Sequence, residues 1–171
     1  FPMVDFDRFS VNVAFTPGDG EKKTYESLKR IETAIWEVND DLNKRFNVTE
    51  GDMIERITTN LGSAFSRQES GAHAGSVDVY PRDLEGFAIS GFEIANMVKQ
   101  KIGPMPEALK FTVGGRNRWG SPVSIGLLSN NLAELDAAKV YLMKRLTELP
   151  QLKDINENLA LGKQEVRLDL K

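Results

Sequence analysis

The chain has 171 residues and a formal net charge of −3 at pH 7, from 22 lysines and arginines against 25 aspartates and glutamates. This length predicts one domain or slightly more, and the near-neutral charge argues against a nucleic-acid-binding role. The absence of cysteine excludes disulfides, thiolate nucleophiles and cysteine metal ligands.

The first part of the chain has the pattern of a strand, a helix and a second strand. Polar and apolar residues alternate over Ser10–Phe15, which predicts a strand that ends at the turn residues 16–20. From Glu21 to Phe46 the apolar residues recur every three or four positions, as in a long amphipathic helix. Residues 53–61 are predicted to form a strand, and Gly62–Gly75, rich in Gly, Ser and Ala, a flexible loop.

The next part supplies a strand, a helix and a strand. Ser76–Tyr80 is predicted as a short strand, and Leu109–Val113 as another. Between them, Ser90 and Glu93 form the pattern of a capping box at the start of a helix that ends after Ile102. The order of elements predicts an α+β fold, a ferredoxin-like βαββαβ sandwich with both helices on one face of an antiparallel sheet.

The pattern then begins again. We expect a strand over Val123–Leu128, a helix capped by Asn131, and strands over Leu152–Ile155 and Glu165–Leu170. This second unit lacks its closing helix and final strand.

The predicted domains are therefore a complete ferredoxin-like unit over 1–115 and, over 116–171, the βαβ first half of a second similar unit. The chain also begins with Phe1 rather than Met. Both features are expected of a segment cut from a longer protein.

Few residues suggest catalysis. His73 lies in the Gly-rich segment with no Ser, Cys or Asp constellation beside it, so we expect a solvated loop histidine. Asp40 and Asp41 are expected on the solvated face of the first helix. The five methionines form no tight cluster, which favours core packing over a thioether metal path. We therefore predict no enzyme activity, no metal and no cofactor.

Two segments suggest binding instead. Gly114–Gly120 combines glycines with Arg116, Arg118 and Trp119, which suits either an anionic or planar ligand or a plain linker. Phe65, in the Gly62–Gly75 segment, either anchors that segment or contacts an apolar ligand.

Several stretches together resemble the periplasmic porter region of resistance-nodulation-division (RND) efflux transporters, the acriflavine-resistance-type exporters of hydrophobic and amphiphilic compounds. The similar stretches, spread over nearly the whole chain, are Phe1–Gly18, Gly120–Ile125, Asn131–Leu135, Leu149–Ile155 and Gly162–Asp169. The resemblance implies one porter subdomain of the second periplasmic half, followed by the part of the next that precedes the docking-domain insertion.

The resemblance also implies a function. Members of this family export amphiphilic small molecules in exchange for protons, as inner-membrane homotrimers with a periplasmic adaptor and an outer-membrane channel. This chain has no apolar run of the roughly 18 residues that a membrane span needs, so we expect the segment itself to stay outside the membrane, in the periplasm.

The family's substrate contacts can be carried over to named positions. Phe65 and Arg67 are expected at the aromatic and basic positions of the flexible switch loop. Residues expected to line the cleft between subdomains are Ser10, Asn12, Arg116, Arg118 and Trp119.

Other functions remain open on the sequence. The main alternative is a ferredoxin-like small-molecule sensing or regulatory module of a larger soluble protein. An acylphosphatase-like enzyme is disfavoured because residues 16–20, after the first strand, contain no arginine to cradle an anion. The metal-exporting branch of the same transporter family is possible, although clustered methionines are missing.

Overall fold

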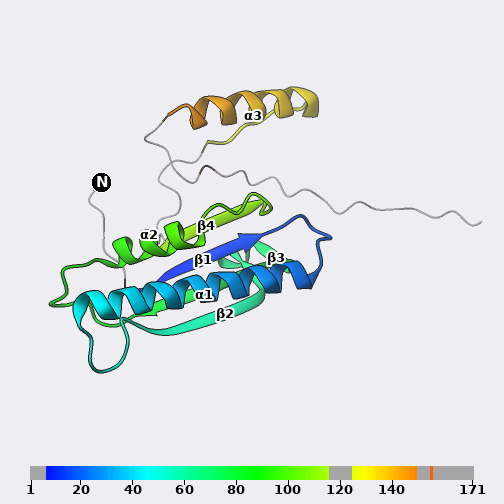
Figure 1. Ribbon diagram of the computed structural model, residues 1–171. Coiled ribbons are helices and arrows are strands. Elements are labelled where there is room, and N and C mark those ends of the chain that lie inside the picture. The colour runs from blue at the N-terminus through cyan, green and yellow to red at the C-terminus, as the bar shows by residue number, and fades with distance from the viewer. Residues whose placement is uncertain (1–6, 116–124, 150–154, 156–171) are drawn as a thin grey trace, which may run out of the picture. The chain divides into compact units, whose positions relative to one another are not determined.

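The structure is a computed structural model that describes residues 7–115, 125–149 and 155 (Figure 1). These residues fall into two compact units, the first holding 7–115 and the second 125–149 and 155. The elements in chain order are β1 (Phe9–Ala14), α1 (Glu21–Phe46), β2 (Ile54–Ala64), the short 3-10 helix η1 (Phe65–Arg67), β3 (Glu69–Pro81), α2 (Gly91–Ile102), β4 (Lys110–Gly115) and α3 (Leu132–Thr147).

The first unit has the predicted ferredoxin-like fold. Its four strands form one sheet in the order β2-β3-β1-β4, and all three neighbouring pairs are antiparallel. In Figure 1, α1 crosses in front of the strands, and α1 and α2 share one core with the sheet. The predicted α+β sandwich over this part of the chain is therefore confirmed.

The core lies between the helices and one face of the sheet. Phe9, Val11 and Val13 of β1 are buried there, and β3 contributes Val77 and Val79 from directly paired positions. The apolar stripe of α1 completes the core with Leu28, Ile31, Ile35, Val38 and Leu42. Burial of these side chains is the main driving force for folding the unit.

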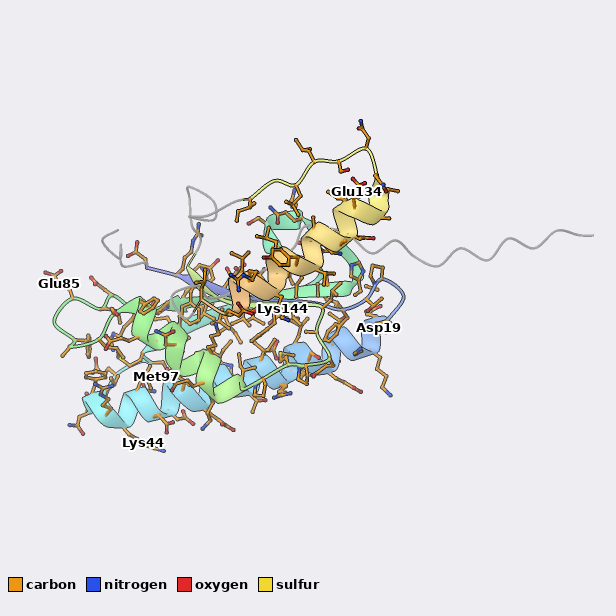
Figure 2. All side chains as sticks on the ribbon, turned by 90° about the horizontal axis from the view of Figure 1, so that it is seen from above. Asp19, Lys44, Glu85, Met97, Glu134 and Lys144 are labelled. Carbon is orange, nitrogen blue, oxygen red and sulfur yellow. The ribbon has the colours of Figure 1, made fainter. Side chains whose placement is uncertain are left out.

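Two helix ends and the packing of three methionines are as the sequence predicts. Asn47 takes the left-handed conformation (φ 50°) that ends α1, and the Ser90–Glu93 capping box begins α2. Met53 and Met105 are buried in the core, and Met97, labelled on α2 in Figure 2, packs against it. Core packing is confirmed for these three methionines.

The second unit differs from expectation in one respect. Asn131 caps α3 as predicted, its side-chain oxygen accepting a hydrogen bond from the Ala133 N–H (3.1 Å). The predicted strand over Val123–Leu128 is wrong for its described part, because 125–128 have no regular structure. Among the described residues no strand pairs with this segment, and an unpaired strand leaves its backbone groups without partners.

Two further strands are predicted near the end of the chain. Glu165–Leu170 and most of Leu152–Ile155 lie outside the described residues, and Ile155 itself belongs to no regular element.

Candidate functional site

Two predicted site residues, Ser10 and Asn12, lie on the face of the sheet opposite α1 and α2, which we call the back face. They alternate along β1 with the buried Phe9, Val11 and Val13, so the pleat directs them away from the helices. Ser10 Oγ donates a hydrogen bond to Asp78 Oδ1 (2.5 Å) on the neighbouring strand. The back face is therefore polar at its centre.

The segment predicted as a flexible loop, Gly62–Gly75, is instead part of a long hairpin. β2 continues to Ala64, η1 makes the turn, and β3 starts at Glu69. The register of β2 and β3 shifts within this segment, because Leu61 pairs with Gly75 but Ser63 pairs with Ser70. Four residues of β3, 71–74, thus stand opposite a single residue of β2, and such a bulge bends a hairpin.

The bend places the end of the hairpin against the back face. We call residues 64–69 the hairpin tip. Ala64 is buried against Ala14 and Ala74 in a small cluster separate from the main core, and Phe65 packs on that cluster half-buried. The Phe65 backbone N–H donates a hydrogen bond to Asn12 Oδ1 (2.7 Å). Asn12 and Phe65, predicted independently as site residues, are therefore neighbours.

The turn at the tip has an unusual backbone. Phe65, Ser66 and Arg67 have φ values of 52°, 57° and 70°, in the left-handed region that disfavours side chains with a Cβ atom. Each such residue costs roughly 1 kcal/mol or more. The contacts of the tip with the back face must offset this strain. Arg67 is exposed, and its contact with a ligand stays a prediction.

A charged cluster joins the tip to the body of the unit. Glu69 accepts a hydrogen bond from Lys110 Nζ at the start of β4 (2.5 Å), and its other oxygen lies 3.5 Å from His73 Nε2. The three side chains are only 10–15% exposed. The hydrogen bond from Lys110 is the main reason that the pKa of Glu69 is lowered; burial opposes it, and His73 adds a smaller lowering effect.

The prediction for His73 is wrong. It is a buried residue of β3, and its Nε2 has no hydrogen-bond partner of good geometry among the described atoms. The bulge explains the error, because it turns His73 inward where the composition of the segment indicated a solvated loop. The backbone of the bulge is fixed by the Phe15 N–H, which donates to the His73 carbonyl (2.8 Å), and by Thr24 Oγ1, which donates to the Ala72 carbonyl (2.7 Å).

The remaining predicted site residues, Arg116, Arg118 and Trp119, lie outside the described residues. Within the described part of the chain, no group of three or more His, Asp or Glu side chains could hold a metal ion. No described helix is long and apolar enough to cross a membrane.

A hollow of about 680 Å³ lies elsewhere, at the opposite end of β3 from the hairpin tip. It is lined by Asp7, Pro81, Arg82, Asp83, Leu84, Glu85, Phe87 and Ile89. Figure 2 shows Glu85 on its loop, far along the unit from Asp19, which precedes α1. None of the predicted site residues lines this hollow.

Sequence reasoning missed Glu69 and Lys110, which hold the tip in place. They are 41 positions apart, and only the sheet order, which puts β4 next to β1, brings them together. Comparison with protein-family models and with curated proteins gives no match.

Proposed function

We propose that the chain is a periplasmic porter segment of an RND-type, proton-driven efflux transporter of the bacterial inner membrane. Its role is to contact small amphiphilic or hydrophobic compounds on their way out of the cell. It does so as a binding surface, without catalysis and without a cofactor. In the intact pump its partners are two further copies, a periplasmic adaptor and an outer-membrane channel.

One observation carries the proposal. The half-buried ring of Phe65 is held beside a polar sheet face through the bond from its N–H to Asn12. An apolar ring next to hydroxyl and carboxamide groups suits molecules that have both apolar and polar parts. The ferredoxin-like unit and the ordered sequence stretches described above support the same interpretation.

A substitution in the intact pump tests the contact. Phe65→Ala removes the ring but keeps the backbone N–H that bonds to Asn12. We expect a several-fold loss of export for some dyes and little change for others, because an adaptable apolar contact matters unequally to different compounds. Dye efflux and drug susceptibility in cells that carry the variant measure it.

Tyr25→Ala is the matched control. Tyr25 is an exposed aromatic residue on α1, the helix that covers the opposite face of the sheet, so its removal should leave every flux unchanged. Unchanged fluxes for all compounds in the Phe65 variant as well would show that the tip does not contact substrate.

The gene gives an independent test. An exporter requires membrane-spanning segments encoded on both sides of this chain. A gene for a soluble protein without them would rule out the proposal and favour the small-molecule sensing or regulatory module.

A further inference from the structure

We propose that Glu69, Lys110 and His73 form a pH-sensitive latch that holds the hairpin tip against the back face of the sheet. One carboxylate on the tip meets two cationic or potentially cationic groups on the body of the unit. Lys110 Nζ lies 2.5 Å from one Glu69 oxygen, and His73 Nε2 lies 3.5 Å from the other. The latch can be tested whether or not the chain takes part in export.

The two partners of Glu69 are fixed independently of the tip. Lys110 begins β4, which pairs with β1. His73 is held through its carbonyl by the Phe15 N–H, and Gly71 (φ +129°) packs so closely that a Cβ atom there would lie 3.2 Å from His73 Nδ1. The backbone of His73 is therefore held by contacts outside the tip.

Within the part of the chain that the structure describes, the tip is held to the back face by few contacts. They are the Phe65–Asn12 hydrogen bond, the small alanine cluster around Ala64, and the latch itself. The backbone strain of three consecutive left-handed residues, none of them glycine, opposes these contacts. An element with few restraints and stored strain is expected to respond to a change in one of those restraints.

Other charged side chains near the latch are those of Asp19, Lys23 and Arg67. The hydrogen bond from Lys23 of α1 is the main cause that lowers the pKa of Asp19, ahead of α1, and the charge of His73 adds a smaller lowering effect. The Lys23–Asp19 pair is at 2.8 Å. Arg67, the charged residue of η1, is exposed. Asp19 is thus largely engaged by Lys23, and Glu69 is the carboxylate that faces Nε2.

The direction of the response follows from these charges. A proton on His73 places a second positive charge beside Glu69 in a largely buried position, so protonation of His73 tightens the latch. Acid strong enough to protonate Glu69 releases the latch. Because Lys110 keeps the pKa of Glu69 low, this release occurs below the ordinary range of a glutamate.

NMR on the full 171-residue chain, without an affinity tag, tests the latch. His73 is the only histidine, so one imidazole Hε1 signal reports its protonation. The Phe65 amide reports the tip, through its protection factor against hydrogen exchange. We expect that protection factor to rise about threefold or more as His73 is protonated, with the same midpoint, while the protection of β1 amides stays constant.

Glu69→Gln should uncouple the two signals, so that His73 still titrates and the tip no longer follows. Glu85→Gln, at an exposed loop carboxylate, is the control and should behave as the parent chain. Lys110→Met is a second variant that keeps both Glu69 and His73, so the tip must still follow His73 protonation; if it stops doing so while the β1 amides stay protected, the assigned pairing of Glu69 with His73 is wrong. A tip that ignores His73 protonation in the parent chain, or a Glu69→Gln tip that still follows it, would overturn the latch.

Discussion

Asn39 is a buried amide on α1 whose two ends connect the helix to the start of β2. Its Oδ1 accepts a hydrogen bond from the Ile54 N–H (2.8 Å), and its Nδ2 donates one to Asp52 Oδ1 (2.8 Å). We expect Asn39→Leu to lower the free energy of unfolding by about 2 kcal/mol, because it leaves the Ile54 N–H buried without an acceptor. Urea unfolding measures the loss.

The neighbouring Asp40→Asn serves as control. Asp40 is exposed, as the sequence predicts for the outer face of this helix, so its change should stay within about 0.5 kcal/mol. Equal effects of the two substitutions would contradict the assigned role of Asn39.

Glu69 is a second single residue for which the structure makes a prediction, here a pH-dependent one. Its pKa in the folded chain is lowered, mainly by Lys110, so its contribution to stability is present above the ordinary glutamate pKa and lost as pH falls through the folded value. Glu69→Gln should therefore lower the free energy of unfolding by about 1 kcal/mol at pH 7 and by much less at pH 3. Denaturant unfolding at both values checks this, and a loss independent of pH would contradict it.

Individual residues show where sequence reasoning ends. The exposure of Asp40 and the burial of Leu28 or Ile35 follow from helical spacing, which is a local property. The inward turn of His73 and the meeting of Asn12 with Phe65, 53 positions later, depend on a bulge and on sheet order. Neither leaves a periodic signal in the sequence.

At the scale of elements, the start of α2 is fixed by its capping box. Ser90 Oγ accepts from the Glu93 N–H (3.2 Å), and Glu93 Oε2 accepts from the Ser90 N–H (2.9 Å). Ser90→Ala should cost about 1 kcal/mol of unfolding free energy, because the helix N-terminus loses an acceptor. Thermal unfolding followed by circular dichroism measures it, with Glu93→Gln as a control that retains an acceptor oxygen and should cost less. A Ser90→Ala chain as stable as the parent would show that the box contributes nothing.

In the turn η1, by contrast, a substitution is expected to preserve or raise the stability of the chain. Ser66 is exposed and its φ is 57°, a conformation that glycine adopts without a Cβ penalty. Ser66→Gly should leave the chain as stable as the parent or more stable, by up to about 1 kcal/mol. Ser70→Gly, at an exposed position within β3, should destabilise it, since glycine weakens a strand. Equal losses in the two variants would contradict a left-handed turn at Ser66.

Elements were predictable where their pattern is periodic. The bounds of α1 follow from its apolar stripe, and those of α2 from its cap and the glycine after it. The sequence of the far half of the hairpin predicts a loop, because its small residues show no alternation; its strand pairing comes from β2 and β1 rather than from its own side chains. The segment 125–128 shows the reverse case, an apolar run that forms no strand.

At the scale of the whole molecule, the first unit has what an independent domain needs. Among the described residues its four strands form one sheet, its two helices bury one continuous core, and the last of these strands, β4, pairs with the first, β1. The described part of this unit therefore ends at Gly115. By contrast, α3 in the second unit buries none of its residues, and a lone helix of 16 residues is marginally stable in water.

These differences predict the behaviour of a shortened chain. Residues 1–115 alone should fold, unfold in one cooperative transition, and match the main transition of the full chain within about 1 kcal/mol, because the core and the sheet pairing of the described residues are retained. Urea unfolding followed by Trp36 fluorescence compares the two, since Trp36 is the only tryptophan left in the shorter chain. Hydrogen exchange on the full chain supplies the control, where amides of α3 should exchange much faster than those of β1. A shortened chain that is unfolded, or that unfolds without cooperativity, would mean that residues beyond 115 are needed to complete the first unit.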